Sequence, residues 1–201
     1  MKEKTAIQKV SDTFKRFEGV SNKSATKMAY SLAVLSTAER KEIAKMIENL
    51  HLYVKICPIC NNWYEGDACP VCSNPSREQS QLLVCSDYRL LEQIELTNAY
   101  KGLYHIIHDL VSVNTTEKTK QEDLIKLRNR IDTCGIEEVI LGFDTNHLGL
   151  VNSKYVEEFL KKCKVTITTL SRGIPYGGII EHYDLFTLEE SIRRREPKRK
   201  K

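Results

Sequence analysis

Four cysteines near the middle of the chain have the spacing of a metal site. Cys57 and Cys60 form one Cys-x-x-Cys pair, and Cys69 and Cys72 form a second pair after an eight-residue spacer. Two such pairs can hold one ion from two sides, as tetrahedral coordination by four thiolates requires. A proline follows the first cysteine of each pair and favours a tight turn. We therefore expect one structural Zn²⁺ with no open coordination position.

Two disulfides are the alternative use of the same four cysteines. Disulfides persist in oxidising compartments, and the chain begins without an apolar stretch that could serve as a signal peptide. A reducing cytosol is therefore expected, which favours the metal site. The other cysteines, Cys85, Cys134 and Cys163, lie in apolar segments and are predicted to be buried thiols.

The composition is that of a folded protein without a membrane-spanning segment. The chain has 201 residues, 41% of them hydrophobic, which is enough for one large domain or two small ones. No apolar run is long enough to cross a bilayer, so no membrane partner is expected. The net charge of +4 permits a nucleic-acid partner without requiring one. Residues 193–201 are rich in Lys and Arg and are either a solvated terminus, a phosphate-binding arm or both.

Three helices are predicted before the cysteines. Apolar residues recur at helical spacing in three stretches: Ile7, Val10, Phe14 and Phe17; Ala25, Met28, Ala29 and Leu32; and Ile43, Met46, Ile47 and Leu50. Ser36 and Glu39 form a capping box at the start of the third helix. We expect all three apolar stripes to be buried core.

Strands and helices alternate after the cysteines. Strands are predicted at 81–85, 102–108, 138–143 and 165–170, with helices at 88–96, 122–131 and 153–162 and a last helix at 187–195. This alternation favours a mostly parallel sheet covered by helices.

The segment between the first two helices could bind a phosphate. Gly19 and Ser21 lie in the connection, and the second helix begins directly after them. In a helix-hairpin-helix, backbone N–H groups of such a hairpin meet a DNA phosphate. Lys23 and Lys27 lie one turn apart on the second helix and could add contacts that do not depend on base sequence. The alternative is an ordinary connection between two core helices.

Signals for catalysis are weak. Asp144 follows the third predicted strand, where a Mg²⁺-dependent nuclease or primase would place a ligand, but Ser86 and Asp87 follow the first strand. We therefore favour loop capping by Asp144 over catalysis.

No Gly-x-x-x-x-Gly-Lys-Ser/Thr segment exists, so an ATPase would lack its phosphate cradle. His105 and His108 face opposite sides of a strand, and neither is expected to be a ligand.

These pieces together resemble the RecR family of bacterial recombination mediators over nearly the whole chain. The order of parts is the same: a helix-hairpin-helix, a four-cysteine zinc finger, a Toprim domain and a Walker B-like loop. Local matches are Lys23-Ser24-Ala25, 73–75, 138–141 and the loop 173–178, in which Gly173, Pro175, Gly177 and Gly178 match the family pattern and Glu181 follows.

The resemblance implies four parts in a multidomain fold of mixed α+β and α/β class. They are a helix-hairpin-helix domain at 1–54, a four-cysteine zinc finger at 55–76 and a Toprim domain at 77–172. The last part, 173–201, holds the Walker B-like loop, a C-terminal helix and the basic tail.

The resemblance also implies a function. RecR-like proteins are non-enzymatic, form homo-oligomers (dimers or tetrameric rings) that encircle DNA, and act with RecO and RecF to load recombinase onto single-stranded DNA. By the same resemblance, Lys23 and Lys27 would face DNA, and the protein would be cytoplasmic and nucleoid-associated.

Some positions depart from the family pattern. The second glycine of the hairpin is Ser21, and Ser86 stands where Toprim enzymes need a Glu. An acidic pair after the third strand falls on 148–150, and a His before the last loop is Arg172. Two alternatives remain: a Mg²⁺-dependent nuclease or primase of Toprim type, and a zinc-stabilised interaction module without a DNA role.

Overall fold

The computed structural model describes residues 3–107, 117–171 and 173–195. The chain divides into two compact units, Met1–Lys55 and Ile56–Lys201, which are described separately below. Among the described residues, no helix is both long enough and apolar enough to span a membrane.

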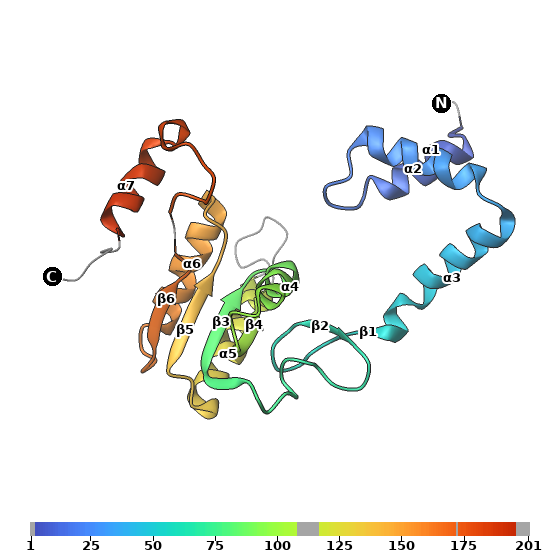
Figure 1. The fold of residues 1–201 in the computed structure, drawn as a ribbon. Coiled ribbons are helices and arrows are strands. Elements are labelled where there is room, and N and C mark those ends of the chain that lie inside the picture. The colour runs from blue at the N-terminus through green and yellow to red at the C-terminus, as the bar shows by residue number, and fades with distance from the viewer. Residues whose placement is uncertain (1–2, 108–116, 172, 196–201) are drawn as a thin grey trace. The chain divides into compact units, whose positions relative to one another are not determined.

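The first unit contains the three predicted helices (Figure 1): α1 (Ala6–Phe14), α2 (Asn22–Val34) and α3 (Thr37–Tyr53). The predicted capping box of α3 is confirmed, because the Glu39 N–H donates to Ser36 Oγ at 3.2 Å and the Ser36 N–H donates to Glu39 Oε2 at 2.7 Å. Thr5 and Gln8 cap α1 in the same way. Side-chain caps thus fix where these helices begin.

The prediction that the three apolar stripes are core is wrong for most of their residues. Ala25 and Ala29 are buried, but α3 has no buried residue, and Met46 is 64% exposed. Ile47 and Leu50 are exposed to a similar extent. Helical periodicity identifies an apolar face without specifying what covers it, and the described residues of this unit do not fully bury any residue of α3.

The second unit is built on a four-stranded parallel sheet with the strand order β4-β3-β5-β6. The strands are β3 (Glu78–Cys85), β4 (Gly102–Ile106), β5 (Glu138–Gly142) and β6 (Thr166–Thr169). The helices α4 (Tyr88–Thr97), α5 (Glu117–Cys134) and α6 (His147–Leu160) connect them in turn. The predicted parallel α/β sheet is therefore confirmed.

The two faces of this sheet bury different partners. Side chains alternate along a strand, so Leu82 and Val84 pack with Leu127 of α5 and Val156 of α6. Leu83 and Cys85 point to the opposite face. There they join a second cluster with Leu91 of α4 and three of the four paired cysteines. The cysteine module, with β1 (Val54–Ile56) and β2 (Trp63–Glu65), is thus part of the core of this unit.

Some helices begin earlier than predicted because polar residues cap them. Asn146 accepts a hydrogen bond from the Gly149 N–H at 2.8 Å, which starts α6 at His147. Asp184 accepts from the Thr187 N–H at 2.9 Å and starts α7 (Leu185–Arg193). The sequence prediction began both helices too late because it did not take Asn146 and Asp184 as N-caps.

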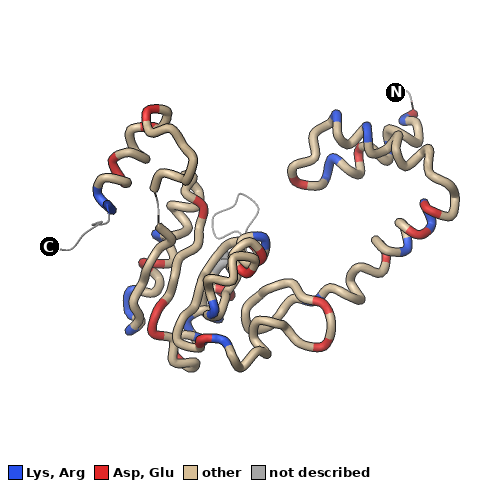
Figure 2. The backbone as a smooth tube through the Cα atoms, viewed as in Figure 1, with Lys and Arg blue, Asp and Glu red and all other residues tan. Residues whose placement is uncertain are grey.

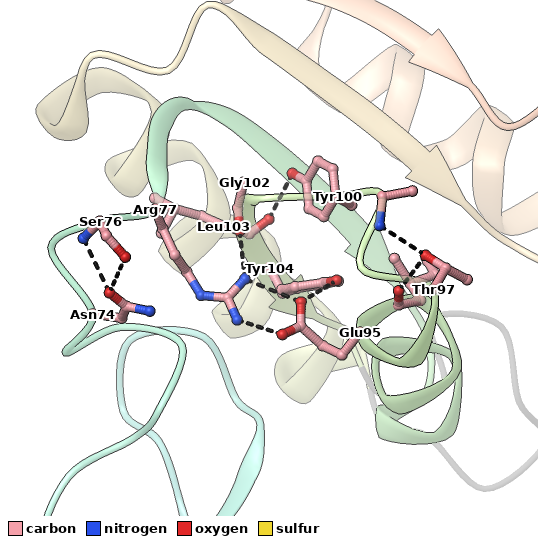
Figure 3. Close-up of polar contacts among 11 residues, drawn as sticks. Asn74, Ser76, Arg77, Glu95, Thr97, Tyr100, Gly102, Leu103 and Tyr104 are labelled. Atoms are coloured by element: carbon pink, nitrogen blue, oxygen red, sulfur yellow. Dashed lines mark hydrogen bonds and ion pairs between the residues drawn. The ribbon is translucent and has the colours of Figure 1, made fainter.

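A polar cluster fixes the exit from the cysteine module onto the sheet (Figure 3). Arg77 donates to both carboxylate oxygens of Glu95 on α4, at 3.1 and 2.5 Å, and to the Gly102 carbonyl at 3.0 Å. The Tyr104 hydroxyl donates to Glu95 at 2.7 Å. The Arg77 side chain is only 11% exposed, so this paired arrangement is stronger than a surface ion pair.

We expect Glu95→Gln to lower the free energy of unfolding by about 1–2 kcal/mol at pH 7, since it removes charged hydrogen-bond acceptors. Hydrogen bonds from Arg77 hold the pKa of Glu95 below its ordinary value of 4.5. The carboxylate therefore stabilises the fold fully above pH 4.5, and its contribution is lost as the pH falls through the lower folded-state pKa. Urea unfolding from pH 7 to pH 3 should show the difference between wild type and variant shrinking below pH 4.5. Glu92→Gln, an exposed site on the same helix, is the control; an equal effect there would contradict the prediction.

Candidate metal centre and nucleic-acid interface

Both cysteine pairs form tight turns closed by backbone hydrogen bonds. In the first turn, the Asn61 N–H donates to the Cys57 carbonyl at 2.9 Å, and the Cys57 N–H donates to the Asn62 carbonyl at 2.8 Å. In the second, the Ser73 N–H donates to the Cys69 carbonyl at 3.0 Å. These bonds hold the two sulfurs of each pair on the same side of their turn.

The structure brings the four predicted ligands together. Their sulfur atoms all lie within 4.8 Å of one another; Cys57 and Cys72 are 3.8 Å apart, and Cys60 and Cys69 are 3.7 Å apart. Four sulfurs placed about 2.3 Å from one ion in a tetrahedron are separated by about 3.8 Å. The two sulfurs of a disulfide lie about 2 Å apart, and none of the seven cysteines forms a disulfide. Among the described residues, this is the only group of three or more side chains suited to a metal ion.

The cluster is shielded from solvent and electrically asymmetric. Cys57, Cys60 and Cys69 are buried and Cys72 is partly buried. The hydrogen bond with Cys60, supported by the positive charge of Arg130, lowers the pKa of Cys72 to about 6. Burial raises the pKa of Cys69. Arg130 thus favours the thiolate form of Cys72, which is the form that binds a metal.

The remaining thiols match the sequence prediction only in part. Cys85 is buried as predicted and Cys163 is half-buried. Cys134 is exposed, so the prediction of a buried thiol is wrong there. It is the last residue of α5, where the chain leaves the helix for solvent.

The metal module pairs with the outer edge of strand β4 at its last residue, Ile106. The Ile106 N–H donates to the Cys60 carbonyl at 2.8 Å, and the Asn61 amide donates to the Ile106 carbonyl at 2.9 Å. The same amide donates to Asp123 on α5 at 3.0 Å. An exposed edge strand presents unpaired backbone groups, and here the first cysteine turn pairs with them.

Sequence reasoning missed three residues of this contact: Asn61, Asp123 and Arg130. Asp123 and Arg130 are charged yet buried, at 9% and 7% exposure. They lie four residues before and three after Leu127, which places all three on one side of α5. The sequence signal that could have found them is the position of two charged residues, Asp123 and Arg130, on the same helix side as the apolar Leu127.

The hairpin of the first unit has the expected local geometry. Gly19 has a φ of +75°, a left-handed conformation that favours glycine, and the Val20 N–H donates to the Phe17 carbonyl at 3.3 Å. Ser21 is the N-cap of α2 and accepts from the Ser24 N–H at 3.1 Å. Ser21, which replaces the second glycine of the family hairpin, therefore caps the start of α2.

Lys23 and Lys27 share the solvent side of α2. Both are exposed, whereas Ala25 and Ala29, on the opposite side, are buried against the unit. Figure 2 marks the Lys and Arg positions of the first unit along its helices. Two cations one turn apart are thus presented outward beside the start of the helix.

The C-terminal loop is shaped by local packing. Gly177 has a φ of +82°, and a Cβ on Gly178 would lie 1.5 Å from the Tyr183 hydroxyl. Glu181 is exposed beside His182, at 3.8 Å. Gly173 lines a cavity of about 410 Å³ with residues of α7, but the other loop glycines do not line it. Arg172 and residues 196–201 of the basic tail lie outside the described residues.

Among the described residues, no cluster of carboxylates that could hold a metal ion forms where β3 and β5 end. Cys85 and Gly142 are in register, so Asp87 and Asp144 follow neighbouring strands. Asp87 caps α4 by accepting from the Arg89 N–H at 2.8 Å, and Asp144 is exposed. Asn146, two residues further on, caps α6, and the predicted loop capping by Asp144 stays a prediction.

His105 is a core residue. It is fully buried, and its two ring nitrogens have no hydrogen-bond partner among the described residues. Burial lowers its pKa to about 4, so it stays neutral at physiological pH. His108 lies outside the described residues.

Gly149→Ala should destabilise the second unit by about 2–3 kcal/mol. A Cβ at this position would lie 2.1 Å from the Asp144 carbonyl oxygen, and backbone cannot move aside as a flexible side chain would. The measurement is urea unfolding. Gly173→Ala is the matched control, because its Cβ would meet only Ser191 Oγ at 4.0 Å. Equal stability of the two variants would refute the prediction.

The fold and site define a metal-binding α/β protein with a separate helical unit, and known relatives match almost its full length. Recombination protein RecR of Bifidobacterium longum subsp. infantis is 30% identical over 187 residues, covering 93% of this chain and 94% of the relative. Recombination protein RecR of Streptococcus pneumoniae is 30% identical over 191 residues, covering 95% and 96%. No family model matches the chain. The chain belongs to the RecR family of recombination proteins, and the resemblance inferred from the sequence is confirmed. Membership of this family implies a role in recombinational DNA repair.

Proposed function

We propose that this protein is a DNA-binding recombination mediator that acts with RecO and RecF to load recombinase onto single-stranded DNA. The observation that carries the proposal is the match to RecR proteins across 93–95% of the chain. The protein would supply binding and positioning and would not be an enzyme. We place it in the cytoplasm, associated with the nucleoid.

The proposed DNA contact is the start of α2. The N–H groups of Asn22 and Lys23 make no hydrogen bond within the described part of the chain, whereas Ser24 and Ala25 donate to Ser21. Free N–H groups at a helix N-terminus attract phosphate oxygens. Lys23 and Lys27 add two positive charges on the same exposed side. Gly19 and Ser21 would set the hairpin geometry.

The proposed cofactor is one structural Zn²⁺ held by Cys57, Cys60, Cys69 and Cys72. The donor set of four sulfurs and the spacing of 3.7–3.8 Å between two of the sulfur pairs support zinc over hard cations, which prefer oxygen. With four protein ligands the ion would hold the module on the sheet and activate no water.

A homo-oligomer, a dimer or a tetrameric ring, is supported by the apolar surface of the first unit. The uncovered face of α3 adjoins a groove of about 480 Å³ lined by Ile7, Val10, Leu32, Ile43 and Ile47. Apolar patches of this kind mark interfaces between proteins. The α3 stripe would then be buried between copies of the chain.

The domain boundaries 1–54, 55–76, 77–172 and 173–201 belong to the same proposal. In it, residues 173–201 carry the Walker B-like loop, with Gly173, Pro175, Gly177, Gly178 and Glu181, and the basic tail adds affinity for DNA. Nucleotide binding is not part of the proposed role of the loop.

A Toprim-type nuclease or primase is the alternative, and the site favours it less. Ser86 cannot replace a carboxylate ligand, and Asp87 is engaged as a helix cap. A two-metal or one-metal mechanism needs several convergent carboxylates.

Recombinase assembly on DNA coated with single-strand-binding protein tests the proposal. We expect this chain together with RecO to speed assembly, with no cleavage or synthesis in Mg²⁺. No acceleration at any ratio of the two proteins would contradict the mediator role.

A further inference from the structure

We infer that Arg130 is the counter-charge of the metal centre and links metal binding to the docking of α5 and β4. Its guanidinium lies against the cysteine cluster, with one nitrogen 3.9 Å from the Cys72 sulfur. The other terminal nitrogen donates to the Tyr104 carbonyl on β4 at 2.6 Å. One side chain of α5 therefore contacts both the cluster and the strand that the metal module covers. The inference rests on the proposed zinc site.

Charge balance is the physical reason. One Zn²⁺ and four thiolates carry a net charge of −2, and removing that charge from water is costly unless a cation lies nearby. Arg130 is only 7% exposed, and no carboxylate of the described residues lies within ion-pair distance of it. A buried guanidinium also needs a partner of opposite charge. The negative thiolates and the positive Arg130 side chain therefore compensate each other's buried charge.

The geometry makes the coupling reciprocal. Loss of the metal would remove the ion that holds the four sulfurs together beside Arg130, which would weaken the hold of α5 on the strand edge. Loss of the arginine charge would leave the metal–thiolate centre uncompensated and lower its affinity for metal. In a thermodynamic cycle, the metal-binding free energy lost on substitution equals the amount by which metal binding increases the stability cost of that substitution.

The variants Arg130→Gln and Arg130→Lys separate charge from hydrogen bonding, because glutamine keeps an N–H donor without the charge and lysine keeps the charge. Competition with a chromophoric zinc chelator should show a ten- to hundred-fold loss of Zn²⁺ affinity, roughly, in R130Q. R130K should recover most of it. Arg128→Gln is the matched control: the residue lies on the same helix, is 45% exposed and pairs with Asp132 instead.

Cobalt substitution gives a measurement that would not change if Arg130 had only a packing role. In Co²⁺-substituted protein, we expect the thiolate-to-metal charge-transfer bands of R130Q to shift relative to wild type and R128Q, since a positive donor at Cys72 has been removed. Wild-type affinity and spectrum in R130Q, or a loss that R130K fails to recover, would overturn the inference. Absence of stoichiometric zinc in wild type would instead defeat the proposed zinc site.

Hydrogen exchange on the wild-type protein tests the same coupling without a variant. Chelation should lower amide protection in the second half of α5 and along β4, more than in β5 and β6. Unchanged protection in α5 and β4 after metal removal would overturn the inference even if R130Q failed to fold.

Discussion

Cys60→Ser is expected to abolish stable metal binding and to lower the free energy of unfolding of the second unit by more than about 4 kcal/mol, the range reached when a structural metal is lost. Cys60 is fully buried, and its carbonyl accepts the hydrogen bond that closes the edge of β4. Because the binding energy of a structural metal is folding energy, losing one ligand should destabilise the strand edge as well as the cysteine turns.

Metal content and thermal unfolding measure this effect. Wild type should contain one zinc per chain and lose thermal stability on chelation, whereas C60S should contain little zinc and be insensitive to chelator. Cys134→Ser is the control, because Cys134 is exposed and outside the cluster. A metal-free wild type of full stability would contradict the prediction.

The double variant Lys23→Ala/Lys27→Ala is expected to lose most DNA affinity without losing stability. Each lysine that neutralises a phosphate contributes to the salt dependence of binding, so removing two should reduce the slope of log K against log salt by about 1.4 on single strands. The loss should be similar for all sequences, since phosphate contacts do not distinguish bases.

Fluorescence anisotropy with labelled oligonucleotides at several salt concentrations measures both quantities. Lys41→Ala/Lys45→Ala is a matched control: these lysines are exposed, have the same spacing and lie on α3 instead of α2. Equal slopes for the two double variants would remove the start of α2 from the proposed interface.

The sequence predicted the order and type of the main elements because local signals agree with one another. Ser36 and Glu39 mark a helix start, and the β-branched and aliphatic run 139–141 marks a buried strand. The spacing of Cys57, Cys60, Cys69 and Cys72 marks the cluster. In each case the residues that carry the signal also make the contact seen in the structure.

What the sequence did not predict depends on contacts between distant segments. Arg130 is 58 residues from Cys72, and Asn61 is 62 residues from Asp123, so no local pattern joins them. The exposed face of α3 failed as a core prediction for a related reason: periodicity shows that a face is apolar but does not identify its partner.

DNA binding by the wild-type protein, with and without RecO and across salt and Mg²⁺ concentrations, tests the central claim most directly. A mediator should bind single-stranded DNA, more tightly at low salt, and leave the DNA intact in Mg²⁺. Failure to bind under every condition would contradict the account, and so would Mg²⁺-dependent cleavage that disappears in Asp144→Ala.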